Sequence, residues 1–363
     1  MRYLFSLSQV FLALLGISSG ARAHEVPALK EVFAGTWQMG VALNEEVVRN
    51  GGAAMHALAS RHFDTVTPEN ELKWSVVHPA EGQFNFAPAD VIADFVRKYG
   101  MSMTGHAFIW HTMAVDWVFE DADGAPASRE CVLARLRTHM GALIERYGEV
   151  VTGWDVVNEA VSEETGEYLR DTQWRRALGD DYVADVFKMA AELAPGAKLY
   201  YNDYNLAKPE KREKTVRLVS DLLDRGIRVD AVGMQCHGDL GYPTAESVAS
   251  SIEAFAALGV RVHISEMDLS LYAFDDHEDR FRTGAPRGVL KEQADRYAAL
   301  FRVFLAHRDI IDRVAFWGLH DGQSWRNYTP VSDRPDYPLL FDAEGRPKPA
   351  FHAVVRAGRK ELP

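Results

Sequence analysis

Short apolar, β-type runs alternate with amphipathic segments along most of this chain. The runs lie at Phe33–Val41, His62–Thr67, Met101–Phe108, Val151–Val157, Ala197–Asn202, Arg228–Gln235, Val260–Glu266 and Arg313–Leu319. Eight such strands separated by helices predict a (β/α)8 TIM barrel, which is an α/β fold in a single domain.

The segments between these runs place apolar residues at helical spacing. One apolar stripe covers Cys131–Tyr147, and Lys211–Arg225 repeats the pattern. Gly226 then follows where a helix C-cap belongs. A doubly wound open sheet is the alternative fold. It would carry a G-x-G-x-x-G turn after its first strand, and the early glycines do not fit that motif.

The first residues have the features of an export signal. Arg2 precedes an apolar stretch from Val10 to Ile17, and Ala21-Arg22-Ala23 forms a small-x-small cleavage site. The stretch is shorter than the roughly 20 residues that a membrane span requires. We therefore predict a signal peptide over residues 1–23, a catalytic domain over 24–363, and a secreted or periplasmic location.

Charge and cysteine content narrow the possible partners. The net charge of −12 at pH 7 disfavours nucleic acid and anionic membranes, whereas a neutral substrate is compatible with it. Two cysteines cannot form a dense disulfide framework, and Cys131 and Cys236 lie far apart in the sequence. We expect both to be free thiols. Separately, we expect the protein to be a monomer.

Polar and aromatic residues gather where the predicted strands end. In a barrel these ends meet at one mouth. In chain order the clusters contain Glu69, Asn70 and Lys73; His106 and Trp110; Asn158 and Glu159; Tyr204; Gln235 and His237; Glu266 and Asp268; and Trp317 and Trp325.

Glu159 and Glu266 each follow an apolar β-type run. A retaining glycosidase needs one carboxyl with a raised pKa as the acid and a second, ionised carboxyl as the nucleophile. Glu159 suits the acid/base role and Glu266 the nucleophile. Asp268 lies two positions after Glu266, on the same face of the strand, where it can orient His237 to keep Glu266 ionised.

The aromatic residues near the mouth favour a sugar ligand. Trp317 and Trp325 offer flat faces for sugar C–H groups, beside polar side chains for the hydroxyls. The histidines suggest a metal site as the alternative. However, His106 and His111 are five residues apart, which is not the i, i+4 pair of a zinc hydrolase. We expect no metal.

Several of these segments resemble the endo-β-1,4-xylanases of glycoside hydrolase family 10, and the resemblance runs from about Gly40 to Val355. Its motifs are Thr67–Trp74, Gly105–His111, Trp154–Glu159, Ile264–Asp268, Leu339–Asp342 and Pro347–Ala350. Ser265 stands where the family usually has Thr.

The resemblance implies a retaining double displacement on xylan or xylo-oligosaccharides, with no cofactor. Glu266 would attack the sugar and Glu159 would protonate the leaving oxygen. The residues implied at the cleavage point are Asn158 on the 2-hydroxyl, with His106, Gln235, His237 and Trp317 around it. Glu69, Asn70 and Lys73 would bind the next sugar on the non-reducing side, and Trp110, Tyr204 and Trp325 match other cleft positions.

One departure from the family pattern concerns that non-reducing-side subsite. Met113 stands where the family commonly has Gln, and a thioether is at most a weak hydrogen-bond acceptor. We expect weaker binding there and a shifted cleavage pattern.

Two alternative functions remain open. A β-glucanase or mannanase would use the same pair of glutamates, although the Glu69, Asn70 and Lys73 cluster favours xylan. A non-catalytic glycan-binding protein is disfavoured because both glutamates are present.

Overall fold

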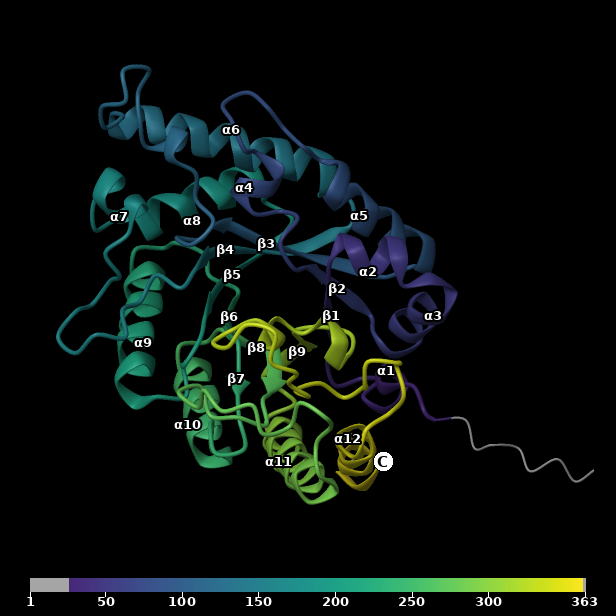
Figure 1. The fold of residues 1–363 in the computed structure, drawn as a ribbon. Coiled ribbons are helices and arrows are strands. Elements are labelled where there is room, and N and C mark those ends of the chain that lie inside the picture. The colour runs from purple at the N-terminus through teal and green to yellow at the C-terminus, as the bar shows by residue number, and fades with distance from the viewer. Residues whose placement is uncertain (1–25, 362–363) are drawn as a thin grey trace, which may run out of the picture.

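The computed structural model describes residues 26–361, so the predicted signal peptide lies outside the described residues. Eight parallel strands form a closed ring, which Figure 1 shows nearly end-on. β6 pairs with β8, and β1 pairs with β9, which leaves no open edge. This closure confirms the TIM barrel and excludes the open doubly wound sheet. The strands are β1 (Gln38–Leu43), β2 (Thr65–Pro68), β3 (Ser102–Ile109), β4 (Val151–Asn158), β5 (Lys198–Asp203), β6 (Ala231–Met234), β8 (Arg261–Leu269) and β9 (Ile311–Phe316).

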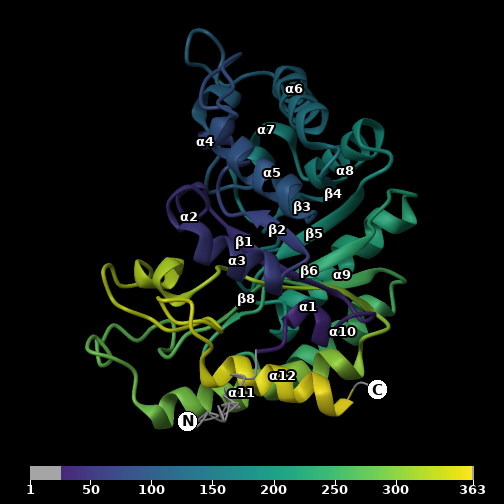
Figure 2. The same cartoon turned by 90° about the vertical axis from the view of Figure 1, so that its right-hand side faces the viewer.

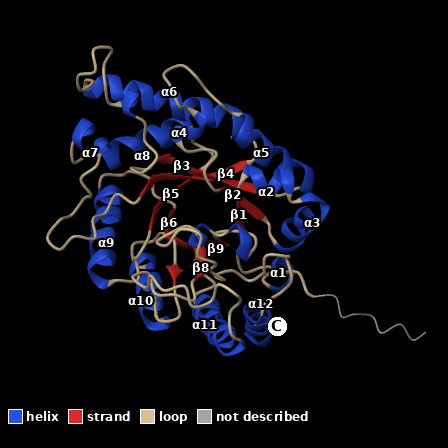
Figure 3. Ribbon diagram, viewed as in Figure 1, coloured by secondary structure: helices blue, strands red, loops and turns tan. Residues whose placement is uncertain are grey.

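Helices cover the outside of the ring, as the colouring in Figure 3 shows. The longer ones are α3 (Gly52–His62), α5 (Ala87–Tyr99), α6 (Arg129–Tyr147), α8 (Tyr182–Leu193), α9 (Pro209–Asp224), α10 (Ala245–Ala256), α11 (Arg287–Ala306) and α12 (Pro349–Glu361). α11 and α12 lie side by side in both Figure 1 and Figure 2. None of the helices in residues 26–361 is both long and apolar enough to cross a membrane.

Shorter elements sit in the connections. They are α1 (Leu29–Val32), α2 (Glu45–Asn50), α4 (Trp74–Val77), α7 (Gln173–Leu178), the two-residue strand β7 (His237–Gly238) and three 3-10 turns, η1 (Asp116–Val118), η2 (Asp321–Gln323) and η3 (Trp325–Asn327). β7 pairs with the far end of β8, with His237 opposite Asp268. This pairing extends the barrel wall beside Glu266.

Local signals set the helix ends, and one of them, at Gly226, was predicted from the sequence. Ser128 caps α6 by accepting the backbone N–H of Cys131, and Pro209 opens α9. Gly226 follows the end of α9 with φ 69°, a left-handed conformation that glycine adopts without steric cost. The two predicted helices are thus confirmed to within two residues.

The first predicted strand began too early. Phe33–Thr36 belongs to the turn after α1, and β1 starts only at Gln38. Phe33 is nevertheless buried, with its ring centroid 5.1 Å from Trp37 and 5.4 Å from Phe301 on α11. These apolar residues therefore pack between the barrel and α11 from a turn. An apolar run alone does not distinguish such a buried turn from a strand.

Both cysteines are free, with Cys131 partly exposed and Cys236 buried.

Candidate active site

The barrel mouth brings together the side chains that follow the carboxyl ends of the strands. Glu159 directly follows β4 and has a left-handed backbone, with φ 59°, while its N–H donates to the carbonyl of Asn202 at 2.9 Å. Non-glycine residues rarely adopt this conformation, and it is found preferentially at functional sites. It turns the chain sharply at the end of the strand.

Two donors hold the Glu159 carboxylate. Gln235 Nε2 donates to Oε1 at 2.9 Å, and Trp110 Nε1 donates to Oε2 at 2.8 Å. Burial by itself raises the pKa of Glu159, but these hydrogen bonds and the charges of His111 and Lys211 outweigh it. The pKa is consequently lowered, and the expectation of a raised pKa at Glu159 was wrong for this state of the site.

Glu266 lies on β8 and is only 4% exposed. Asn202 Nδ2 donates to its Oε1 at 2.6 Å, and His237 Nε2 lies 3.2 Å from its Oε2. The other ring nitrogen of His237 lies 2.9 Å from Asp268 Oδ2. The structure therefore places Asp268, His237 and Glu266 in one row.

Asp268 is fully buried and has several partners. Trp325 Nε1 donates to its Oδ2 at 2.8 Å, and Arg326 Nη2 donates to its Oδ1 at 3.1 Å. Although burial raises the pKa of Asp268, the charges of Arg326 and His237 lower it to about 2. In turn, Asp268 and Glu266 outweigh the effect of burial on His237 and raise its pKa to about 9. At neutral pH the row therefore contains an imidazolium next to Glu266.

Asn202, on β5, joins the two glutamates, and the sequence reasoning did not single it out. Besides Glu266, its amide lies within hydrogen-bond distance of the Asn158 amide, at 3.0 Å, and Asn158 in turn lies 3.3 Å from Glu159. Its position at the end of the fifth predicted strand was the one signal that could have found it.

The sequence reasoning also missed the ion pair between Asp203 and Lys211, in which Lys211 Nζ lies 2.7 Å from the Asp203 carboxylate. Both side chains are buried, and Lys211 Nζ also lies 3.4 Å from the ring centroid of Tyr204. The Tyr204 hydroxyl accepts from Arg170 at 2.7 Å. This pair lies beside the mouth at the end of β5, and Lys211 places a positive charge near Glu159.

The residues after β2 form the opposite wall of the mouth. Asn44 Nδ2 donates to Glu69 at 2.9 Å, and Lys73 Nζ donates to Asn70 at 3.0 Å. Burial raises the pKa of Glu69 and lowers that of Lys73. Lys73 Nζ lies 4.4 Å from the ring centroid of Trp110 and 5.9 Å from that of Trp317. The Lys73 ammonium group therefore offers a polar contact close to two aromatic rings.

Trp317 follows β9 and borders two histidines. Its ring packs edge-on against His106, with centroids 5.2 Å apart, and lies 6.3 Å from His237. His106 is held by Asp155, with Nδ1 2.9 Å from Oδ2. Each histidine is thus oriented by its own carboxylate, and within residues 26–361 no group of three or more His, Cys, Asp or Glu is arranged to hold a metal ion.

Known proteins share this architecture. The family model described as "Glycosyl hydrolase family 10" matches residues 28–357. An endo-1,4-beta-xylanase of Geobacillus stearothermophilus is 41% identical over 332 residues, which is 91% of this chain and 98% of that protein. Endo-1,4-beta-xylanase A of Caldicellulosiruptor saccharolyticus is 42% identical over 297 residues, covering 82% and 86%.

Solved structures agree with these sequence relatives. Xylanase XynB from Paenibacillus barcinonensis, complexed with a conduramine derivative, superposes with a TM-score of 0.88 at 38% identity. The match covers 92% of this chain and 99% of that one.

Proposed function

The chain belongs to glycosyl hydrolase family 10, and on that premise we propose that it is a retaining endo-1,4-β-xylanase acting on xylan or xylo-oligosaccharides. The carrying observation is the pair of glutamates at the barrel mouth, each held by different donors. Glu266 is held by Asn202 and His237, and Glu159 by Gln235 and Trp110. Two positioned carboxyl groups at one cleft are the groups that glycoside hydrolysis needs.

In the first step Glu266 attacks the anomeric carbon of the sugar, and the bond to the leaving oxygen breaks as Glu159 protonates that oxygen. The product is a covalent glycosyl ester on Glu266. In the second step Glu159 removes a proton from water, and the water oxygen displaces Glu266 from the sugar. The imidazolium of His237 and the amide of Asn202 favour the ionised, attacking form of Glu266.

The lowered pKa of Glu159 suits the second step, in which this residue acts as a base. The first step needs the protonated form. A sugar that fills the cleft excludes water from the carboxyl, and this desolvation favours its protonated form. Transfer of that proton to the leaving oxygen then leaves Glu159 ionised, so that it can act as the base while the sugar is still attached to Glu266.

The walls of the mouth provide the subsites. We assign the sugar at the cleavage point to Asn158, His106, Gln235, His237 and Trp317. The next sugar on the non-reducing side falls to Glu69, Asn70 and Lys73, whose ammonium group sits between indole rings. Trp110, Tyr204 and Trp325 complete the cleft. Neutral hydroxyls and sugar faces suit this mixture of polar and aromatic groups.

The test is the time course of products from soluble β-1,4-xylan, with β-glucan and mannan alongside. Wild type should release short xylo-oligosaccharides, and Glu159→Ala and Glu266→Ala should not. Glu164→Ala is the matched control, because Glu164 is an exposed glutamate in the loop after β4. Products from β-glucan or mannan but not from xylan would overturn the assignment of xylan as the substrate. Full activity of either alanine variant would overturn the catalytic role of the glutamate that it replaces.

Azide distinguishes the two roles. Added azide should restore activity to both variants but give different products. Glu159→Ala still forms the covalent intermediate, so azide should yield a β-xylosyl azide, whereas Glu266→Ala cannot form it and should yield an α-xylosyl azide. The opposite stereochemistry would reverse the assignment. A glycan-binding protein that does not hydrolyse its ligand would bind xylan, but neither the wild type nor any variant would release products.

We further propose that residues 1–23 are a cleaved leader and that residues 24–363 form one exported, monomeric catalytic domain. Mass spectrometry of the mature N-terminus would test the cleavage. Size-exclusion chromatography with light scattering would test the monomer.

A further inference from the structure

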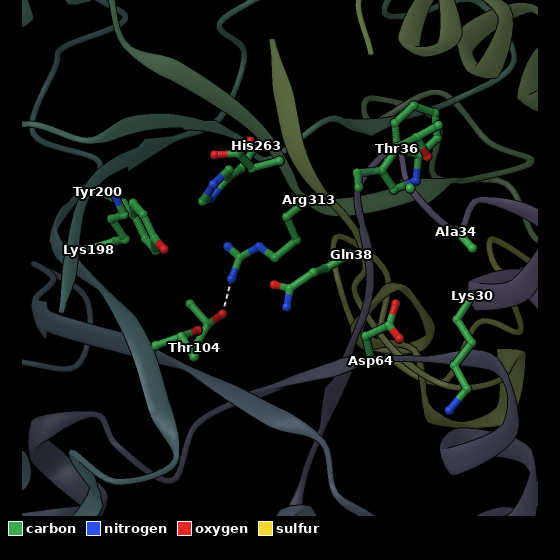
Figure 4. Close-up of a pocket in the computed structure, with 14 residues that line it drawn as sticks. Lys30, Ala34, Thr36, Gln38, Asp64, Thr104, Lys198, Tyr200, His263 and Arg313 are labelled. Carbon is green, nitrogen blue, oxygen red and sulfur yellow. Dashed lines mark hydrogen bonds between the residues drawn. The ribbon is translucent and has the colours of Figure 1, made fainter. Parts of the chain in front are cut away.

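A second polar cavity, of about 600 Å³, lies at the end of the barrel opposite the proposed active site. Figure 4 shows its lining side chains. Several come from the N-terminal halves of the strands: Gln38 opens β1, Lys198 opens β5, and Arg313 is the third residue of β9. Glu266, in contrast, lies in the second half of β8, and Glu159 follows the end of β4. Because the strands are parallel, the two sites face opposite ends of the barrel.

Arg313 is the central feature of this basal cavity. Arg313 is 3% exposed, and its one hydrogen bond within residues 26–361 goes from Nη1 to the hydroxyl of Thr104. Its Nε has no partner, and no carboxylate of residues 26–361 forms an ion pair with it. A buried guanidinium without a counter-ion is costly, since the lost hydration is not replaced.

The acidic residues around the cavity are already engaged. The Asp312 carboxylate pairs with Arg261 at 2.5 Å, and Asp64 accepts the backbone N–H of Met39 at 3.0 Å. Neither neutralises Arg313. Among the lining residues, the cationic side chains of Lys30, Lys198 and Arg313 outnumber the carboxylates of Asp64 and Asp312, which favours a negative ligand from solution.

Two groups near Arg313, Tyr200 and His263, are neutral and able to donate. The Tyr200 ring centroid lies 5.7 Å from the guanidinium carbon, and His263 packs edge-on against Tyr200 at 4.4 Å. His263 is 4% exposed, and its Nδ1 has no partner. Burial raises the pKa of Tyr200 to about 12 and lowers that of His263 well below its ordinary value. Both therefore remain neutral at pH 7, and each retains a proton to donate.

Gly153 makes room for this arrangement. A Cβ at that position would lie 2.2 Å from the Tyr200 hydroxyl oxygen, so a side chain there would push the phenol out of place.

We propose that the basal cavity binds a small oxyanion, such as phosphate or a carboxylate, on the Arg313 guanidinium, with His263 and Tyr200 as additional donors. A guanidinium presents its N–H groups in a fork that fits such anions. The ligand would neutralise the buried charge and link β9 to β5 and β8. This role is independent of glycoside cleavage, and it stabilises the folded barrel, because a ligand of the native state shifts the unfolding equilibrium.

The test is the midpoint of thermal unfolding of the mature protein during separate titrations with sodium phosphate and sodium acetate at constant ionic strength. At ten times the dissociation constant of the anion that binds, the midpoint should rise by about 2 °C in the wild type. It should not rise in Arg313→Met. Arg302→Met is the matched control, because Arg302 is an exposed arginine on α11 that does not line the cavity, and it should respond like the wild type.

Equal rises in all three proteins would mean a general salt effect and would overturn the proposal, as would no response to either anion. If Arg313→Met does not fold, calorimetric titration of the wild type and of His263→Leu with the same anions decides the question. Saturable one-site binding that weakens severalfold in His263→Leu supports the site, and the absence of saturable binding rejects it. Hydrolysis of xylan should not change with the anion, which separates this test from that of the proposed function.

Discussion

Replacement of Asn202 by alanine removes a side chain that links Glu266 to Asn158 and, through Asn158, to Glu159. Asn202 is fully buried, and its amide donates to Glu266 at 2.6 Å. A hydrogen bond to a charged group contributes about 1.5–3 kcal/mol. At about 1.4 kcal/mol per tenfold change in rate, we expect kcat/KM to fall roughly 10- to 150-fold.

The assay is steady-state hydrolysis of an aryl β-xylobioside with a good leaving group. Such a substrate needs little help from Glu159, so its rate reports on attack by Glu266. Ser265→Ala is the control, because the Ser265 hydroxyl donates to Asn202 at 2.6 Å and not to either glutamate. It should cost less than about tenfold, as expected for one neutral hydrogen bond. Thermal unfolding of both variants separates lost activity from lost folding.

The reasoning would be refuted by an Asn202→Ala enzyme with kcat/KM within about threefold of wild type, since a bond of the expected strength costs at least about tenfold. Equal losses in Asn202→Ala and Ser265→Ala would instead assign the effect to packing around β5.

Three further substitutions test other contacts of the site. Trp110→Phe removes an N–H that Glu159 accepts, so the pKa of Glu159 should rise and the alkaline limb of kcat/KM should move to higher pH; an unchanged limb would contradict this contact. Asp268→Asn removes the charge that outweighs burial in raising the pKa of His237 to about 9, so NMR should show His237 titrating at lower pH than in wild type, and a wild-type value near 6.5 would reject the pairing. Because the folded-state pKa exceeds the unfolded one, the stability from His237 is complete below pH 6.5 and lost as pH rises through 9, which calorimetry should record as a falling midpoint over that window. Met113→Gln restores a donor in the loop after β3, where the Met113 carbonyl accepts from Ser75, and should lower KM and change product lengths; unchanged values would refute the expected weak subsite.

The positions of the strand-end residues could be predicted from the sequence, whereas their partners could not. Glu159 and Glu266 each stand at the end of an apolar run, which is a local pattern, and the parallel barrel then brings such ends to one mouth. That argument says nothing about which donor reaches which oxygen. The bond from Asn202 to Glu266 spans 64 residues, and the bond from Trp110 to Glu159 spans 49.

The first strand shows a limit of the pattern itself. Phe33 is as apolar as a strand residue, but it packs against Phe301 from a turn. Burial satisfies an apolar side chain in either conformation, so hydrophobicity alone did not locate the start of β1.

The sequence by itself determined the (β/α)8 class, the helix end at Gly226, and the glutamates that face the mouth, because periodicity and capping are properties of neighbouring residues. Only the tertiary structure decided the lowered pKa of Glu159, the bridging position of Asn202 and the unpaired charge of Arg313. Each of these depends on strand register and side-chain conformation across the barrel, and both are set by the packing of the whole fold.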